Sequence, residues 1–412
     1  MSAREIREVF GNGKNLLLCG SVMKPPAELK ALSGKAQCVY LDPPFMTGRK
    51  FSRKRPYGER GWKRGTPVLT LPGFEDAFEN QREYMRLLRK MITFSRELLS
   101  ESGVFYLHLD WRMVAHARLL CDRVFGAEKF LNEIIWGYES GGRTRKCFPR
   151  KHDTILMYAK GKNYRFDLTR LPLSRAEKRR NHMARGIDEE GRTYSSIMSH
   201  GREYRYYDDE PVYPGDVWTD ISILQQRDPE RTGYATQKPL KLLDRLLRPV
   251  TEAGDLVVDL CCGSGTTLQA AQELGCDFAG MDIDAAAIAV TLARLKPENL
   301  TVVCPAPGEA AELLAAYDEK AGRLRVEGLR LPDEERLTDP EGNLESWDAG
   351  AMEHGIFRPW KSYRRSFLYP ALVDSLQVSP EEIPPAILAT DAAGRRHLFR
   401  WNRETQKYCL IE

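Results

Sequence analysis

A short strand followed by a glycine-rich turn constrains the fold of this chain more than any other feature. Residues 257–260 (VVDL) form an apolar run of the buried-strand kind, which leads directly into residues 262–265 (CGSG) and then into helix-like residues 268–274. Glycines between a strand and a helix allow positive φ angles and let a ligand approach the main chain closely. We therefore predict that this turn lies at the ligand-binding edge of a parallel β-sheet.

The same alternation of strand-like and helix-like segments extends over most of the chain. Apolar runs typical of strands are residues 15–18, 38–41, 104–109, 134–138, 154–158 and 278–283, and helical spacing marks residues 82–100, 115–125 and 239–248. Alternating strands and helices predict an α/β fold, with a parallel sheet that is covered on both faces.

Length and composition exclude several classes of protein. A chain of 412 residues can hold two or three compact units, and 42% hydrophobic with 29% charged residues excludes wholesale disorder. No apolar stretch approaches the roughly 18 residues of a membrane span, and the polar start MSARE lacks a signal core, so we expect a cytoplasmic protein without a membrane partner. The nine cysteines show no CxxC pair and no metal-like spacing, which predicts neither disulfides nor a metal site.

Charge is distributed unevenly along the chain. Residues 49–64 contain eight basic residues and one acidic residue, and residues 141–186 contain fourteen basic and three acidic residues. Residues 308–350 reverse this pattern, with twelve acidic and five basic residues. Solvated charged faces would also account for each run taken singly, but the asymmetry as a whole favours a nucleic-acid groove. The candidate contacts to nucleic acid are Arg49, Lys50, Arg53, Lys54, Arg55, Arg143, Arg145 and Lys146.

The glycine-rich turn has the features of a nucleoside-binding site. Asp282 ends the strand that follows the turn and could accept hydrogen bonds from both hydroxyls of a ribose. A dinucleotide-binding turn would have a third glycine in place of Leu268, and a phosphate-binding loop would have a lysine in place of Gly265. The sequence therefore indicates a ribose-bearing cofactor without a polyphosphate, which S-adenosylmethionine fits. Candidate cofactor residues are Asp259, Cys261, Gly263, Ser264, Gly265, Thr266 and Asp282.

A second motif, Asp42-Pro43-Pro44-Phe45, directly follows the strand-like residues 38–41. An exocyclic amine on a nucleobase is a poor nucleophile because its lone pair is delocalised into the ring. Acceptors on both amine hydrogens expose that lone pair, and the Asp42 carboxylate and the Pro43 carbonyl could supply them. Prolines leave such a pocket without N–H groups, and Phe45 offers a face on which an extruded base can stack. Taken alone, the motif is also typical of a rigid turn.

These motifs resemble those of the DNA amino-methyltransferases, specifically the permuted β group of the N6-adenine and N4-cytosine family, in which the catalytic motif precedes the cofactor motif. The resemblance covers residues 15–295 and includes LDPPFMTGRKF, VFYLHLDWR, FLNEIIW, KHDTILMYAK and YATQKPL. It implies a Rossmann-like, S-adenosylmethionine-dependent methyltransferase fold that is circularly permuted.

The resemblance also implies roles for residues outside the two motifs. Thr236, Gln237 and Lys238 would hold the methionine end of the cofactor, where a cation suits a carboxylate. Ser21 stands where the family usually has an acidic residue that contacts the cofactor's adenine, and its hydroxyl would bind that amine more weakly.

We divide the chain into a catalytic half (residues 1–164) with a basic loop (46–80), a target-recognition insert (165–213), a cofactor-binding half (214–303) and a C-terminal accessory domain (304–412). We expect a site-specific methyltransferase that acts on N6 of adenine in double-stranded DNA and is associated with the nucleoid. The alternatives are transfer to N4 of cytosine by the same fold and a non-catalytic DNA-binding protein that retains it. A restriction system would require a nuclease on another polypeptide, and a homodimer is left open.

Overall fold

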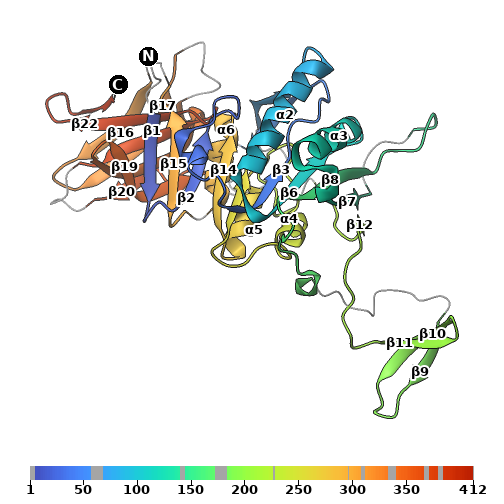
Figure 1. Cartoon of the computed structure of the whole chain (residues 1–412). Coiled ribbons are helices and arrows are strands. Elements are labelled where there is room, and N and C mark those ends of the chain that lie inside the picture. The colour runs from blue at the N-terminus through green and yellow to red at the C-terminus, as the bar shows by residue number, and fades with distance from the viewer. Residues whose placement is uncertain are drawn as a thin grey trace.

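The computed structural model describes residues 5–56, 68–139, 144–171, 183–225, 228–295, 297–307, 311–332, 340–365, 371–378 and 384–411. In this part of the chain, one mixed sheet extends through the body of the molecule, and the strands within residues 184–207 lie apart from it (Figure 1). The first part of the sheet consists, in spatial order, of β12 (Val217–Trp218), β7 (Phe130–Gly137), β8 (His152–Ala159), β6 (Leu99–Leu109), β3 (Ala36–Leu41), β13 (Leu256–Asp259), β14 (Asp277–Asp282), β2 (Asn15–Cys19), β15 (Leu300–Pro305) and β1 (Glu5–Phe10).

The centre of this sheet is parallel. From β6 through β3, β13, β14 and β2 to β15, each strand pairs in parallel with the next, whereas β8 is antiparallel to both of its neighbours and β1 is antiparallel to β15. The carboxyl ends of the parallel strands therefore meet at one edge, which is where open α/β sheets bind ligands. In the chain, β3 with the catalytic motif precedes β13 with the glycine-rich turn.

Helices cover both faces of the sheet, which confirms the predicted α/β class. One face carries α1 (Ala27–Lys30), α2 (Gln81–Leu98) and α3 (Val114–Phe125), which is followed by η1 (Ala127–Lys129); the other carries α4 (Leu240–Leu247), α5 (Thr266–Glu273) and α6 (Ala285–Arg294). Side chains of β3 alternate between these two cores, with Tyr40 in one and Val39 and Leu41 in the other. Within the described residues, no helix combines the length and the apolar character required to cross a membrane.

Residues 46–80, expected to be a basic loop, contain a β-hairpin instead. The antiparallel strands β4 (Arg49–Pro56) and β5 (Val68–Asp76) form it, and its tip at residues 57–67 lies outside the described residues. The high charge of the segment hides its period of two. Phe51 and Arg53 lie on one face of β4, where Phe51 stacks on Phe74 of β5 and Arg53 is buried.

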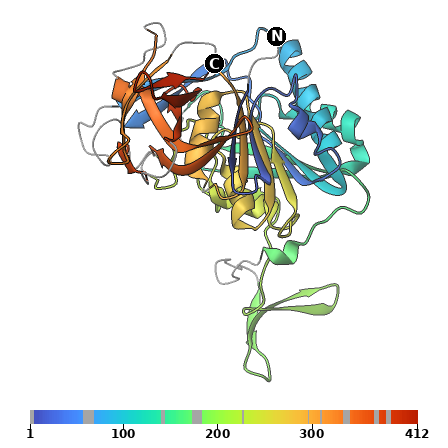
Figure 2. The same cartoon turned by 90° about the vertical axis from the view of Figure 1, so that its left-hand side faces the viewer.

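The expected target-recognition insert contains a small separate sheet. After η2 (Leu168–Arg170), strands β9 (Ala184–Ile187), β10 (Thr193–Ser199) and β11 (Arg202–Tyr207) form a three-stranded antiparallel sheet that projects from the body (Figures 1 and 2). Its described side chains belong to none of the hydrophobic clusters found in the described chain. An isolated sheet of this size depends on a face that is covered.

The C-terminal part of the chain is a β-structure with a core of its own. The large sheet continues from β1 into β19 (Ile356–Arg364), β18 (Leu344–Glu353), β21 (Ala386–Asp391), β22 (Arg396–Asn402) and β23 (Lys407–Leu410), and a second sheet consists of β16 (Glu312–Asp318), β17 (Arg323–Arg330) and β20 (Ser375–Gln377). A short helix, α7 (Pro340–Asn343), precedes β18. Leu324, Trp347 and Phe399 lie in the hydrophobic cluster shared by the two sheets.

Candidate active site

The motif that begins with Asp42 lies at the carboxyl edge of the sheet, directly after β3. The two residues that follow the motif are held by Asp76, a buried residue at the end of β5. The Asp76 carboxylate accepts hydrogen bonds from the main-chain N–H groups of Met46 (2.8 Å) and Thr47 (2.9 Å). These bonds hold Met46 at a φ of 59°, which a non-glycine residue rarely adopts. The hairpin therefore shapes the loop that follows Phe45, a role of Asp76 that the sequence did not reveal.

A buried polar network lies beneath Phe45. The fully buried His108 contacts the Tyr40 hydroxyl through Nδ1 (2.7 Å) and Asp153 through Nε2 (3.2 Å), and the Tyr138 hydroxyl donates to Asp153 (2.9 Å). Burial alone would raise the pKa of Asp153, but its interactions with His108 and the positive charge of Lys238 lower it. The ring of Phe45 lies 6.0 Å from that of His108, so the network supports the side chain that was expected to stack on a base.

Asp42 pairs with Lys238. The Lys238 ammonium lies 2.5 Å from Asp42 Oδ2, and the two side chains are only 12% and 17% exposed. Asp42 Oδ1 is buried and has no hydrogen-bond partner among the described residues. Lys238 was expected to contact a cofactor carboxylate, whereas the structure places its ammonium on the carboxylate of Asp42. The pair leaves one oxygen of Asp42 available as an acceptor.

The glycine-rich turn folds as predicted and is tied to the next strand. Gly263 has a φ of 50°, and a Cβ atom there would lie 3.1 Å from the Tyr234 ring. The Gly263 N–H donates to Asp282 Oδ2 (2.9 Å), and Asp282 Oδ1 accepts from the main chain of Asp284 (2.9 Å). Main-chain N–H groups thus hold the Asp282 carboxylate, whose oxygens keep lone-pair capacity for a further donor.

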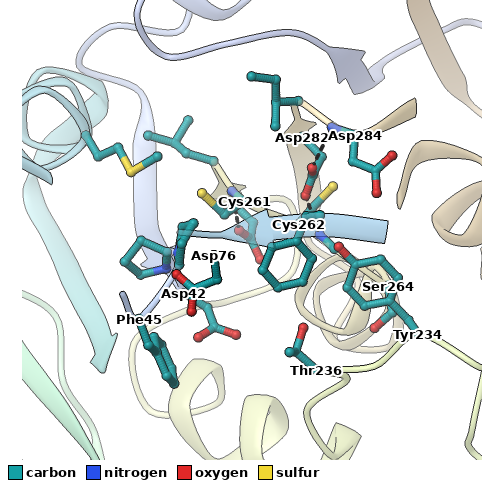
Figure 3. Close-up of a pocket in the computed structure, with 18 of the residues that line it drawn as sticks. Asp42, Phe45, Asp76, Tyr234, Thr236, Cys261, Cys262, Ser264, Asp282 and Asp284 are labelled. Atoms are coloured by element: carbon teal, nitrogen blue, oxygen red, sulfur yellow. Dashed lines mark hydrogen bonds between the residues drawn. The ribbon is translucent and has the colours of Figure 1, made fainter. Parts of the chain in front are cut away.

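The two motifs face one cavity of about 440 Å³. Figure 3 shows Asp42 and Phe45 on one side of it, and Asp282 and Asp284 on the other. The predicted site residues that line it are Ser21, Asp42, Pro43, Pro44, Phe45, Thr236, Lys238, Asp259, Cys261, Gly263, Ser264, Thr266 and Asp282. A volume of this size is typical of small-molecule and cofactor sites.

Two of the predicted cofactor residues, Gln237 and Gly265, do not line the cavity. The side-chain amide of Gln237 accepts from the N–H of Thr232 (2.8 Å) and donates to the carbonyl of Glu230 (2.7 Å), so it shapes the segment before Lys238. Gly265 caps α5 with a φ of 75°, and a Cβ atom there would lie 2.7 Å from Thr291. Gln237 and Gly265 therefore shape segments that line the cavity without lining it themselves.

Three aromatic rings form a wall of the cavity that the sequence did not predict. Phe51 stacks on Phe74 (4.8 Å between ring centroids), and Phe74 stacks on Tyr234 (6.2 Å). All three residues line the cavity, although the first two come from the hairpin and Tyr234 comes from the segment before α4. The only signal in the sequence was the aromatic content of a segment that otherwise looked like a charged loop.

Burial controls the ionisation of groups in the cavity. It raises the pKa of Asp259 to about 7 and that of Asp282 to about 6. Burial also raises the pKa of the Cys261 and Cys262 thiols, which therefore stay protonated at neutral pH and are poor nucleophiles.

The expected nucleic-acid contacts fall into different environments. The assignment of Arg53 is wrong: it is 5% exposed, pairs with Glu345 (3.0 Å) and donates to the Ala392 carbonyl (2.8 Å), so it joins the hairpin to the C-terminal β-structure. Alternation along β4 turns this side chain inward. Arg49, Lys50, Arg145 and Lys146 are exposed, and Lys50 pairs with Glu75 (3.2 Å). Arg143 and the side chains of Lys54 and Arg55 lie outside the described residues.

Comparison with known protein families finds a match over most of the chain. The model of the N6/N4 DNA methylase family matches residues 36–293, which include both motifs and most of the cavity lining. The chain belongs to the DNA methylase family. This membership confirms the resemblance inferred from the two motifs and agrees with the observed α/β fold.

Individual proteins are similar to this chain at low sequence identity. The type II methyltransferase M.EcaI of Enterobacter cloacae is 25% identical over 300 residues, which cover 60% of this chain and 62% of that protein. The DNA adenine methyltransferase YhdJ of Escherichia coli K12 is 25% identical over 289 residues, covering 69% of this chain and 84% of that protein. The solved structure of the PvuII DNA methyltransferase (cytosine-N4-specific) is 14% identical, with 71% of this chain and 91% of that chain covered at a TM-score of 0.44.

Proposed function

We propose that this methylase transfers a methyl group from S-adenosylmethionine to N6 of adenine at a specific site in double-stranded DNA. The observation that carries the proposal is that Asp42, with one unpaired buried oxygen, shares a cavity with the glycine-rich turn and Asp282. A nucleophile activated beside Asp42 would therefore meet a cofactor held by the turn. Family membership supplies the reaction class.

The chain fits this cofactor. Gly263 leaves room beside Tyr234 that any larger residue would fill, and the Asp282 carboxylate at the end of β14 can accept the ribose hydroxyls. The hydroxyl of Thr236 and the ammonium of Lys238, which has three N–H donors, suit the methionine end. Bound S-adenosylmethionine supplies an electrophilic methyl group on a sulfonium.

The catalytic segment acts by orientation and by hydrogen bonding. Asp42 Oδ1 accepts one hydrogen of the adenine amine, and the carbonyl of Pro43 accepts the other. This directs the nitrogen lone pair away from the ring and toward the methyl group. Once N6 has gained the methyl group and the bond from that carbon to sulfur has broken, the nitrogen loses a proton to Asp42 Oδ1, which passes it to solvent. Phe45, supported by His108 below it, holds the extruded base by stacking. Alignment of nitrogen and methyl group supplies the rate enhancement, and no covalent enzyme intermediate is needed.

Adenine is favoured over cytosine as the target by the first residue of the motif, which is Asp42 and not the serine more often seen in cytosine-type members. The similarity of the chain to an enzyme named as a DNA adenine methyltransferase also favours adenine. Transfer to N4 of cytosine would use the same acceptors, because both amines carry two hydrogens on a ring-conjugated nitrogen.

Site recognition is assigned to residues 165–213. The projecting sheet β9–β11 exposes Ile187 (69%), Tyr204 (44%) and Tyr206 (36%) on one face, and no cluster within the described chain covers that face. Bound DNA would cover it. The relatives named as type II methyltransferases favour a role beside a restriction endonuclease carried on a separate polypeptide.

The target base can be tested directly. DNA from cells that express the chain should contain N6-methyladenine at one sequence motif, detected by sequencing that distinguishes modified bases and by mass spectrometry of digested nucleosides. An inactive Asp42→Ala strain provides the background. N4-methylcytosine as the only new base would show that the target is cytosine.

A further inference from the structure

The loop between β7 and β8 combines positive charge with an exposed aromatic ring. Its residues 144–151 (TRKCFPRK) include four basic residues and no acidic residue. Residues 144–150 are all exposed, and Phe148 is 95% exposed, which is extreme for so large an apolar side chain. Figure 1 shows this loop extending outward beyond α3.

The strand directions place this loop on the same edge of the sheet as Asp42. β7 is antiparallel to β8, and β8 is antiparallel to β6, so β7 ends at the edge where β6 and β3 end. The pair Gly137–His152 closes the ladder there, and the N–H of Tyr138 bonds to the carbonyl of Lys151 (2.8 Å). The loop thus projects from the edge that carries the cavity.

Trp111 adds a second exposed aromatic ring at this edge. It follows the end of β6 and is 43% exposed. The guanidinium of Arg150 lies 3.7 Å from the centre of its ring, and that of Arg112 lies 5.0 Å from it. Arg112 also pairs with Asp110, whereas Arg150 makes no ion pair within the described residues. The Arg150 cation therefore remains available to an anionic partner.

We propose that residues 144–151 and Trp111 form a contact surface for duplex DNA, and that the Phe148 ring enters the base stack where the target base has left it. The cations of Arg145, Lys146 and Arg150 match the phosphate backbone in charge. An apolar side chain inserted between bases stabilises an unstacked step, and an aromatic ring stacks on any base. The proposal rests on the proposed function, because a base in the cavity must first leave the duplex.

The first experiment asks whether position 148 touches DNA. The photoreactive residue p-benzoylphenylalanine is placed at Phe148 and, as a control, at Leu119, which is 61% exposed on α3. Each protein is irradiated with a 30-base-pair duplex that carries the methylated motif. We expect a crosslink from position 148 and none from position 119. Absence of a crosslink from position 148, with the duplex bound, would overturn the surface. If the wild-type chain itself bound no duplex, the proposed function would fall first.

The second experiment asks whether the ring is inserted. Affinity is measured by fluorescence anisotropy on a duplex that carries the methylated motif and on one that lacks it, in which no base is extruded. Phe148→Ala should weaken binding to the duplex with the motif at least fivefold and to the duplex without it less than twofold, and Phe148→Trp should restore binding. Equal weakening on both duplexes would show that Phe148 is an ordinary contact and would overturn insertion.

Discussion

The two oxygens of Asp42 have different surroundings, and Lys238 accounts for the difference. Its ammonium binds Oδ2, while Oδ1 is buried and has no hydrogen-bond partner in the part of the chain that the structure describes. An unpaired buried carboxylate is costly, and the ion pair with Lys238 offsets part of the cost of burying Asp42. We therefore propose that Lys238 acts on the reaction through Asp42, in addition to any contact with the cofactor.

We expect Lys238→Met to lower kcat by about 10- to 100-fold, as a misplaced reacting group typically does. Lys238→Arg should recover part of the loss. Steady-state kinetics with separate titrations of cofactor and DNA provide the measurement. Lys241→Ala, which removes a 65% exposed cation one turn away, is the control and should change little. A rise in the KM for S-adenosylmethionine with an unchanged kcat would assign Lys238 to the cofactor alone.

Cofactor affinity should depend on pH through Asp282. Burial raises the pKa of this group to about 6, so its carboxylate is ionised above that pH and protonated below it. The ionised form offers only acceptors to the ribose hydroxyls, and the protonated form does not. Binding of S-adenosylhomocysteine, measured by calorimetry from pH 5 to 8, should therefore weaken as the pH falls below about 6. Asp282→Asn should bind weakly and abolish this dependence; an unchanged pH profile in the variant would argue against Asp282 as its origin.

At the scale of elements, the hairpin β4–β5 links three parts of the molecule. Asp76 at its end holds the catalytic loop, Phe51 and Phe74 line the cavity, and Arg53 reaches Glu345 and Ala392 in the C-terminal β-structure. Displacement of the hairpin would therefore disturb the cavity and the catalytic loop together.

Loss of the Arg53 contacts to Glu345 and Ala392 should disturb the cavity and leave contacts to DNA phosphates unchanged. Arg53→Met should weaken cofactor binding several-fold, and Glu345→Gln should do the same, because each variant breaks one buried pair. The slope of log affinity for DNA against log salt should stay unchanged. By contrast, Arg49→Ala at an exposed position should flatten that slope by up to about 0.9, the value for one lost phosphate contact. A flatter slope for Arg53→Met would restore its assignment to DNA.

At the scale of the whole molecule, the C-terminal β-structure is joined to the catalytic sheet by a buried ion pair. Glu8 on β1 and Arg396 on β22 are 0% and 3% exposed and pair with each other, next to the strand contact between β1 and β19. Burial raises the pKa of Glu8 to about 7 despite this cation. The accessory domain is therefore part of the same folded body.

Arg396→Met should destabilise the chain by about 3–5 kcal/mol, the usual effect of leaving one buried charge unpaired. Denaturant unfolding followed by circular dichroism measures the change. Glu8→Met combined with Arg396→Met should recover much of the loss, because no charge is then left alone. Arg358→Ala, at an exposed pair with Glu353, should change stability by less than about 1 kcal/mol. A loss equally small for Arg396→Met would show that this junction contributes little.

The sequence predicted those parts of the site that depend on strand ends. Asp42, Asp259 and Asp282 were placed correctly at one edge, because parallel strands direct their carboxyl ends to the same side. Contacts between distant segments could not be predicted in this way. Arg53 meets Glu345 across 292 positions and Lys238 meets Asp42 across 196, and periodicity says nothing about which elements become neighbours.

The strands of the insert, residues 165–213, could not be predicted from the sequence either. Both faces of β9–β11 are largely exposed, so polar and apolar residues do not alternate strongly enough to reveal strands. The hairpin was hidden for the opposite reason, since charge obscured the side chains that pack. In both cases, tertiary contacts and not local pattern decide the structure.

We propose that Asp42 activates the amine, and that the glycine-rich turn and Asp282 hold the cofactor. Single-turnover methyl transfer with Asp42→Ala separates these two roles. The cofactor is labelled in its methyl group, and its binding is measured on the same preparation. We predict that the transfer rate falls by about 10²–10⁴-fold while the variant remains folded and still binds the cofactor. Methyl transfer at the wild-type rate by the Asp42→Ala protein would contradict the account.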